Sequence, residues 1–462
     1  MGFRPSRASG LFRSSFTAQQ RPRISTCPQC TQSLSFRTRA TPITNFNFTH
    51  QRKSSTWTAA VSAAQNLMSA ASASSKEAAA QGVSVDPLRI VAKEMKFLTK
   101  NIRQLLGSGH PTLDTVAKYY THAEGKHMRP LVVLLMSRAT ALTPTISRQS
   151  FATQTASVDS PISPSSILLD NNPSFPETNP LTTEPASFTS TSAPDSDILP
   201  SQRRLAEITE LIHTASLLHD DVIDTSEARR GSPSANIEFG NKMAVLAGDF
   251  LLGRASIALA RLRDPEVIEL MATVIANLVE GEFMQLKNTA RDEKYPKWTE
   301  ETISYYLQKT YLKTASLISK SSRSAALLGQ NTPEVVEAAY QFGRNLGLAF
   351  QLVDDMLDYT VSAQELGKPA GADLELGLAT APLLFAWKNE PELGALVGRK
   401  FSKEGDVLRA RELVARSDGV EQTRALAQDY ADKAVAAISP FPESEAKDGL
   451  IEICVKTMNR RK

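Results

Sequence analysis

The chain has 462 residues, of which 41% are hydrophobic and three are cysteines. A chain of this length can bury a large core, and three cysteines exclude a scaffold built on disulfides. The net charge of +3 is unevenly spread, because residues 1–75 hold nine Lys or Arg and no acid, which leaves 43 bases against 49 acids, or −6, in the remainder.

The hydrophobic pattern predicts an all-α fold. Stretches rich in Ala and Leu with helical periodicity are frequent, and alternating runs of β-branched residues are rare. No stretch reaches about 18 uninterrupted apolar residues, so we expect no transmembrane helix.

Residues 1–75 are basic, rich in serine and free of acids, which is typical of a mitochondrial or chloroplast transit peptide. The alternative is a basic arm that binds nucleic acid, but the segment lacks clustered Lys or Arg runs, so we expect no nucleic-acid partner. Cys27 and Cys30 have metal or redox spacing, yet they lie in the segment we expect to be removed, and no second pair accompanies them. Cys454 lies in an apolar stretch and is expected to be a buried structural thiol.

The first basic station is Gly125-Lys126-His127-Met128-Arg129-Pro130. We expect Lys126 and Arg129 to lie one helical turn apart. Arg binds phosphate through two parallel hydrogen bonds and Lys acts as a point charge, so the pair suits a phosphate ester. A role on the solvated surface is the alternative for any such pair alone.

Residues 143–201 differ from their surroundings in composition. They hold nine of the 25 prolines, many Ser and Thr, and Arg148 as the one basic residue. No hydrophobic period is present, so we predict a disordered insertion between two helices.

A cluster of three aspartates, Asp220, Asp221 and Asp224, ends the next helical stretch. Apolar residues at steps of three and four precede the cluster and place it on an amphipathic helix: Leu205, Ile208, Leu211, Ile212, Ala215 and Leu218. Arg229-Arg230-Gly231 follows within ten residues. A lone cluster of this kind is equally well read as a solvated acidic end of a helix.

A second aspartate cluster, Asp354, Asp355 and Asp358, follows another amphipathic run that contains Phe342, Leu346 and Val353. Lys313-Thr314 precedes this run, and Gly367-Lys368 follows it. Packed carboxylates would repel one another unless a strong positive charge lay between them. Oxygen ligands of this kind suit Mg²⁺, which binds through one or two carboxylates and substrate phosphates. The two clusters and the basic stations therefore predict a site for two phosphate esters, one held by metal and one by cations.

The motifs resemble those of the trans-isoprenyl diphosphate synthases. Residues 213–224 with 229–231 are similar to the first aspartate-rich motif of that family, and residues 350–358 to the second. The stretch from Gly367 to Pro382 resembles the branch that makes long-chain products. The resemblance covers residues 86–142 and 203–462, so 86–462 would be the catalytic domain, interrupted by the insertion.

The resemblance implies an all-α isoprenoid-synthase bundle around a deep central cavity, a homodimer (with a heteromer as the alternative) and three Mg²⁺ ions per active site. Metal ligands would be the six aspartates Asp220, Asp221, Asp224, Asp354, Asp355 and Asp358. Catalytic residues would be Asp220, Asp221, Asp224, Lys313, Thr314 and Gln351. The allylic diphosphate would be held by Arg229, Lys313 and Lys368, and isopentenyl diphosphate by Lys126, Arg129, His213 and Arg230, with Thr314 and Gln351 at the reaction centre. Glu282 and Gln285 depart from the pattern of short-chain members and receive no role.

The expected reaction is the repeated condensation of isopentenyl diphosphate onto an allylic diphosphate such as farnesyl or geranylgeranyl diphosphate. Metal and cations would neutralise the departing diphosphate, and exclusion of water would protect the carbocation. Ala215 and Ser216, five and four positions before the first aspartate, fall where family members have the floor of the product pocket. Their small side chains favour a long product of 30 to 50 carbons; close helix packing is the alternative reason for small residues there.

A long product together with the N-terminal signature suggests synthesis of the ubiquinone side chain in the mitochondrial matrix, with plastoquinone as the alternative in a plastid. Peripheral contact with the inner membrane is an option that the apolar product suggests. A terpene cyclase is a competing reading, although cyclases have a less regular second metal motif. A non-catalytic or partner-dependent subunit is another, although such subunits typically lose aspartates that are intact here. We expect Arg460-Arg461-Lys462 to be a solvated end, with a reach to the active-site mouth as the alternative.

Overall fold

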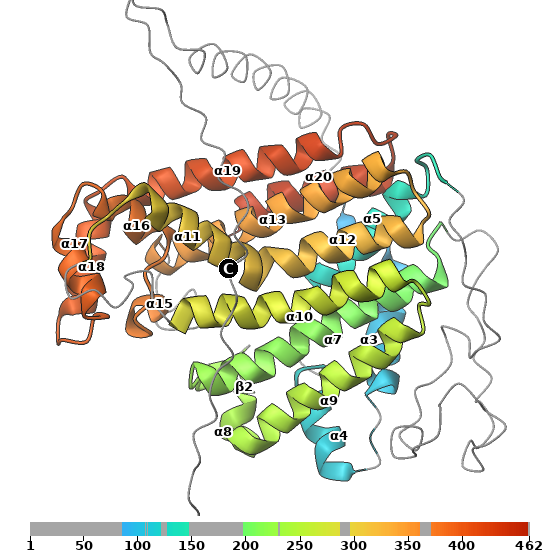
Figure 1. Ribbon diagram of the computed structural model, residues 1–462, viewed down its shortest axis with the longest axis horizontal. Helices are drawn as coiled ribbons and strands as arrows, with labels where there is room; N and C mark the ends of the chain where they lie inside the picture. Colours follow the sequence, from blue (N-terminus) through green and yellow to red (C-terminus); the bar gives the residue numbers. More distant parts are fainter. Residues whose placement is uncertain are drawn as a thin grey trace, which may run out of the picture. The chain divides into compact units, whose positions relative to one another are not determined.

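The computed structural model describes residues 86–106, 108, 110–121, 127–146, 197–229, 232–286, 296–360 and 371–460. The expected transit peptide, most of the expected insertion, and Lys126, Arg230 and Lys368 lie outside these ranges. The described part is built from helices and one short antiparallel strand pair, β1 (Ala228–Arg229) with β2 (Ser232–Pro233), which confirms the all-α prediction (Figure 1).

The helices follow the chain in a fixed order. They are α2 (Pro87–Ile90), α3 (Ala92–Leu105), α4 (Pro111–Lys118), η1 (Tyr119–Thr121), α5 (Met128–Thr140), α7 (Pro200–Ile223), α8 (Ala235–Phe239), α9 (Asn241–Ala260), α10 (Pro265–Leu286), α11 (Glu300–Thr310), η3 (Tyr311–Ala315), α12 (Ser316–Leu328), α13 (Pro333–Thr360), α15 (Ala372–Glu375), α16 (Ala381–Trp387), α17 (Glu392–Gly398), α18 (Asp406–Ala415), α19 (Gly419–Ala437) and α20 (Glu445–Met458).

The first residues of two helices, α5 and α7, bear on the sequence predictions. Helix α5 begins at Met128, after His127 in a left-handed conformation with φ 39°. Lys126 lies outside the described ranges, so its expected spacing from Arg129 stays a prediction. Helix α7 begins at Pro200, because proline is favoured in a first turn where its missing N–H is not needed.

Helices α7 and α13 form the centre of the bundle because their apolar stripes are long and complete. On α7, Leu205, Ile208 and Leu211 are at most 1% exposed, as the periodicity predicted. Helix α13 packs between α12 and α19, while α7 packs on α9 and α5. Both α7 and α13 end at the same end of the bundle, beside β2 and α15 (Figure 1). The fold thus brings the last turns of these two helices, and the aspartates on them, to one end.

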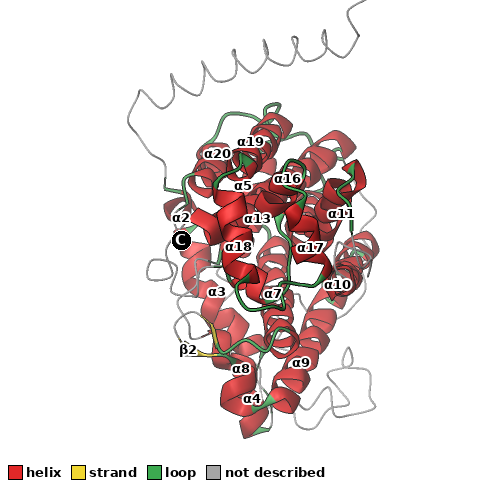
Figure 2. Cartoon of the chain, turned by 90° about the vertical axis from the view of Figure 1, so that its left-hand side faces the viewer, coloured by secondary structure: helices red, strands yellow, loops and turns green. Residues whose placement is uncertain are grey.

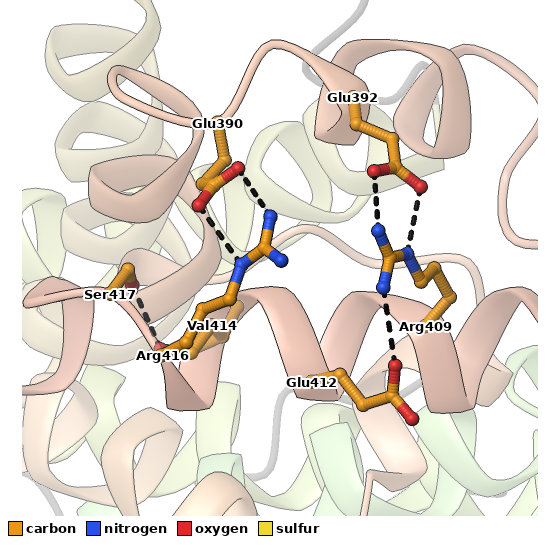
Figure 3. Close-up of polar contacts among 7 residues, drawn as sticks. All are labelled: Glu390, Glu392, Arg409, Glu412, Val414, Arg416 and Ser417. Carbon is orange, nitrogen blue, oxygen red and sulfur yellow. Dashed lines mark hydrogen bonds and ion pairs between the residues drawn. The ribbon is translucent and has the colours of Figure 1, made fainter.

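Helices α16, α17 and α18 form a cap on the α13 side of that end (Figure 2). A second apolar cluster joins them to the last half of α13, with Leu352, Leu384 and Leu413 fully buried. On the outside, Arg409 donates two hydrogen bonds to Glu392, at 2.8 and 2.7 Å, and Arg416 pairs with Glu390 at 2.8 Å (Figure 3). Exposed ion pairs stabilise little, so the apolar cluster holds this cap in place.

Helix α9 is long and apolar enough to span a membrane. Within its apolar stretch of 18 residues, 44% is buried in the bundle. Its buried side, which includes Ala244, Ala247 and Leu251, packs on α7. A buried core helix satisfies the same length and composition, so this is weak support for a membrane span.

A π-helical turn, η3, connects α11 to α12 and contains Lys313 and Thr314. Two glycines allow neighbouring helices to approach it closely. A Cβ on Gly347 of α13 would lie 2.6 Å from the Cα of Ala315, and one on Gly281 of α10 would lie 2.9 Å from the backbone nitrogen of Lys313. Single π turns often occur at functional sites, and this one re-aims both side chains relative to a regular helix.

Candidate active site

The first aspartate cluster occupies the C-terminal end of α7. Asp220 and Asp221 lie in its last turn. Asp224 is the C-cap residue, and its backbone N–H donates to the backbone carbonyl of Asp220 at 2.8 Å. The C-terminal end of a helix carries a partial negative charge, so three carboxylates there are destabilising without a cation. The location is thus unfavourable for a merely structural acidic group.

Asp221 is fully buried and both its oxygens are engaged. Arg229 on β1 reaches one oxygen through two nitrogens at 2.6 and 2.7 Å, and the Tyr120 hydroxyl donates to the other. Tyr120 also accepts a hydrogen bond from the Ala235 N–H at 2.8 Å, at the start of α8. Asp221 therefore fixes the β-hairpin and η1 against the end of α7.

Asp220 and Asp224 lack such partners and face Lys313 and Glu282. Burial raises the pKa of Asp220 to about 6 and also raises the pKa of Asp224; Lys313 opposes both shifts, and Glu282 adds to them. Lys313 donates to Glu282 at 2.5 Å. Lys313, with Arg229 as a weaker contributor, thus opposes the charge of three carboxylates that come from α7 and α10.

A hydrogen-bonded relay leads from the π turn to the second cluster on α13. The Thr314 hydroxyl donates to Gln351 at 2.9 Å, and Gln351 donates to Asp355 at 2.9 Å. Tyr306 donates to the other oxygen of Asp355 at 2.5 Å. Burial raises the pKa of Asp355, and both hydrogen bonds oppose that shift. The middle aspartate of each cluster is therefore buried and held by a tyrosine.

The outer aspartates of the second cluster differ from the middle one. The side chain of Asp354 is 37% exposed and lies 3.3 Å from Arg460, whose guanidinium also stacks on Phe350 at 4.7 Å. Asp358 is buried, with one oxygen accepting from Gly371 N–H at 3.3 Å; the other oxygen has no hydrogen-bond partner in the part of the chain that the structure describes. The expectation of a solvated chain end is thus wrong for Arg460, which reaches the site.

The basic station on α5 meets the middle of α7. Arg129 lies 2.9 Å from the Nε2 of His213, and His127 lies 3.1 Å from Glu210. This contact joins two of the residues expected to bind isopentenyl diphosphate. One turn along α7, Ala215 is fully buried and Ser216 is half-buried, its hydroxyl donating to the His213 carbonyl at 2.8 Å. Their expected role in product length stays a prediction.

Sequence reasoning missed several residues that shape the site. Tyr120 and Tyr306 come from helices far away along the chain, and no spacing links them to Asp221 and Asp355. Glu282 had a signal, since it departs from the short-chain pattern, and the structure pairs it with Lys313. The roles expected of Lys126, Arg230 and Lys368 concern residues outside the described ranges.

The carboxylates fit a divalent cation. Among the described residues, no hydrogen-bond donor occupies the carboxylate oxygens of Asp220 and Asp224, and a buried oxygen of Asp358 has no partner. An all-α bundle that gathers two such clusters and several Lys and Arg side chains at one end defines an enzyme that binds phosphate esters with metal.

Residues 184–414 match the polyprenyl synthetase family. The chain is 70% identical over 414 residues to a probable mitochondrial hexaprenyl pyrophosphate synthase of Neurospora crassa, covering 89% of this chain and 90% of that protein. It is 47% identical over 434 residues to the mitochondrial hexaprenyl pyrophosphate synthase of Saccharomyces cerevisiae, covering 82% and 91%. The chain belongs to the polyprenyl synthetase family.

A solved structure gives the same fold. The polyprenyl synthase of Caulobacter crescentus, in complex with calcium and isoprenyl diphosphate, superposes with a TM-score of 0.65 at 30% identity, over 82% of this chain and 99% of that one. The isoprenoid-synthase fold, the prenyl-transferring activity and the mitochondrial localisation are thus confirmed. The family uses a divalent metal and prenyl diphosphates, whereas Mg²⁺ itself, the number of ions and the oligomeric state stay predictions.

Proposed function

We propose that the chain extends an allylic diphosphate by repeated addition of isopentenyl diphosphate to an all-trans hexaprenyl diphosphate, the 30-carbon end of the expected range. The hexaprenyl names of the two relatives support this length, and the small Ala215 and Ser216 are compatible with it. The product would supply the ubiquinone side chain in the matrix or at the inner-membrane surface.

One observation carries the proposal: the π turn connects the two aspartate clusters. Its Lys313 faces Asp220 and Asp224 on α7, and the next residue, Thr314, begins the relay to Asp355 on α13. A substrate between the clusters would meet an ammonium and a hydroxyl from the same turn. Aspartates on a solvated acidic surface would not require a lysine and a threonine of the same turn to face both clusters.

The roles of the aspartates follow from their partners. We assign Asp220, Asp224 and Asp354 to Mg²⁺, because their oxygens face cations or solvent. Asp358 would contribute its unpartnered oxygen. Asp221 and Asp355 were expected to be ligands as well; their buried hydrogen bonds support a positioning role, in which they orient the ends of α7 and α13.

The remaining side chains serve the reaction by binding and orientation. Mg²⁺, when bound, neutralises negative charge on the diphosphate as it leaves. Lys313 and Arg229 would hold that diphosphate, and Arg129 with His213 would hold isopentenyl diphosphate beside it. Thr314 and Gln351 would line the space where the new carbon–carbon bond forms. The apolar core around α7 would exclude water from the allylic carbocation that forms when the diphosphate leaves.

We also propose a homodimer. Helices α9 and α10 expose apolar side chains that a bundle of this size rarely leaves in water: Val245, Leu246, Val279, Phe283 and Leu286. Residues 1–75 are proposed to be the transit peptide. Residues 143–201 are proposed to be an insertion, of which catalysis does not need residues 147–196, because the two ends, 143–146 and 197–201, belong to the described part of the fold. Deletion of 147–196 should retain full turnover; loss of turnover in a folded deletion variant would contradict this.

The test uses the purified chain from residue 80 onward with Mg²⁺, farnesyl diphosphate and labelled isopentenyl diphosphate. We expect a ladder of products that ends at 30 carbons and disappears in Asp220→Ala and in Asp354→Ala. Products that end at 20 carbons would contradict the assignment of Ala215 and Ser216. A folded chain without any product would instead indicate a subunit that depends on a partner.

A further inference from the structure

Lys309 on α11 is a buried cation that the proposed function has not used. The residue is 8% exposed, and its ammonium lies 5.3 Å from the centre of the Tyr306 ring. Within the described ranges, no carboxylate lies at ion-pair distance from this ammonium, and no acceptor is hydrogen-bonded to it. Burial removes much of the hydration of this ammonium, and among the described residues only through-space attraction from Asp355, Asp373 and Glu282 offsets that cost.

A second buried lysine shows what full compensation requires in this fold. Lys447 is 5% exposed and donates to the carbonyls of Ser439 and Phe441 at 3.0 and 2.8 Å, and to Glu443 at 2.7 Å. Lys309 has none of these contacts, and burial lowers its pKa. Among the described residues, Lys309 therefore has no direct acceptor, which leaves its ammonium able to bind an anionic ligand.

The surroundings of Lys309 identify where that ligand would lie. Asp355, Lys313, Asp373 and Glu282 lie close enough to act on its charge, so Lys309 belongs to the same group of charged side chains as the second aspartate cluster and Lys313. Tyr306 supports the ammonium with its ring and holds Asp355 with its hydroxyl. An anion bound between the two clusters would therefore lie near both Lys313 and Lys309.

We propose that Lys309 is a further diphosphate-binding residue, which contacts the allylic diphosphate on the Asp355 side while Lys313 contacts it on the Asp220 side. This inference rests on the proposed function. Two ammonium groups four residues apart would then divide the negative charge of the leaving group. A bound anion would reduce the mutual repulsion of Lys309 and Lys313.

The experiment measures binding of inorganic diphosphate to the folded enzyme by calorimetry, in excess Mg²⁺ and again without metal. The variants are Lys309→Met, which removes the charge at similar volume, and Lys309→Arg, which keeps it. Lys388→Met is the matched control, because that lysine also lies over a ring, 5.1 Å from Trp298, but on the exposed surface of the cap. Melting temperatures are recorded with and without diphosphate.

We expect Lys309→Met to weaken diphosphate affinity by about tenfold to a hundredfold, as for loss of a charged hydrogen bond. Its unliganded melting temperature should equal or exceed that of the wild type, because an uncompensated charge is gone. Lys309→Arg should retain most of the affinity, and Lys388→Met all of it.

Two results would overturn the inference. One is unchanged diphosphate affinity in Lys309→Met. The other is a lowered unliganded melting temperature with an intact ligand-induced rise, which would make Lys309 a support for Tyr306 alone. A wild type that binds diphosphate but transfers no prenyl group would instead refute the proposed function.

Discussion

Asp220 and Asp221 are adjacent in sequence, yet their environments assign them opposite tasks. Asp221 is buried with two partners, whereas Asp220 faces Lys313 and Glu282 without a donor of its own. Helical geometry separates their side chains by about 100°. The same division recurs between Asp354 and Asp355 on α13, so each cluster combines one anchored carboxylate with acids available to a ligand.

The two neighbours should respond differently to replacement by asparagine. Asp221→Asn leaves Arg229 without its buried carboxylate and should lower the free energy of unfolding by about 3 kcal/mol. Asp220→Asn should leave that free energy unchanged or slightly higher, while abolishing turnover. Urea denaturation and single-turnover assays would check both; equal losses of stability would contradict the distinction.

Metal affinity should depend on pH through Asp220, whose pKa of about 6 lies far above the usual value. Protonation removes a ligand, so Mg²⁺ affinity should fall as pH drops from 7 to 5, and Asp220→Asn should bind more weakly with a flatter profile. In the metal-free protein, the contribution of Asp220 to stability changes with pH in the direction opposite to that of the Mg²⁺ affinity. The folded state keeps its proton to a higher pH than the unfolded chain, so the contribution of Asp220 to stability is present below about pH 4 and is lost as pH rises through 6.

The comparison between wild type and Asp220→Asn isolates this group from the other acids. Calorimetric Mg²⁺ titrations at several pH values test the first statement, and urea denaturation in chelator tests the second. A wild-type Mg²⁺ affinity that is constant from pH 7 to pH 5 would show that Asp220 is already ionised throughout.

At the scale of elements, the π turn is the part of the site most sensitive to packing. It is confined by Gly347 on one side and Gly281 on the other. Gly347→Ala would place a Cβ 2.6 Å from the Ala315 Cα, against backbone that cannot easily move. We expect the free energy of unfolding to fall by about 1–3 kcal/mol. The free energy of diphosphate binding should fall by more than this, because the displaced turn carries Lys313.

Gly449→Ala on α20 is the matched control. Its new Cβ would also lie 2.6 Å from a neighbour, but that neighbour is the flexible end of Ile90 in a part of the core away from the aspartates. The control should therefore lose stability without losing diphosphate affinity. If both variants bind diphosphate equally well, the glycine does not protect the geometry of the turn.

The elements also show how far sequence reasoning extends. The apolar stripes of α7 and α13 predicted two long helices ending in aspartates, and both are present because periodicity reports burial directly. The resemblance assigned Thr314 and Gln351 to the reaction centre, but it did not predict the hydrogen bond between them. The π turn and the tyrosine partners of Asp221 and Asp355 did not, because they depend on how closely distant helices approach. Lys309 gave no signal, since a lysine within a polar helical stretch is expected to be exposed.

At the scale of the whole molecule, the outer surface of α10 links assembly to the site. Glu282 points inward to Lys313, while the next residue, Phe283, is 60% exposed. In a two-fold dimer each copy would bury the same patch against its partner, and each large apolar side chain would contribute roughly 1.5–3 kcal/mol. Phe283 would then hold α10, and with it Glu282, against the π turn.

Phe283→Asp should therefore produce a monomer with reduced turnover, as measured by light scattering during size-exclusion chromatography and by product assay on the same fractions. Leu408→Asp on α18 is the matched control, because Leu408 is 64% exposed but lies outside the proposed interface. It should remain dimeric and active. A wild type that is monomeric at full activity would reject the dimer, whereas a monomeric Phe283→Asp variant with full turnover would retain the dimer and remove its link to Glu282.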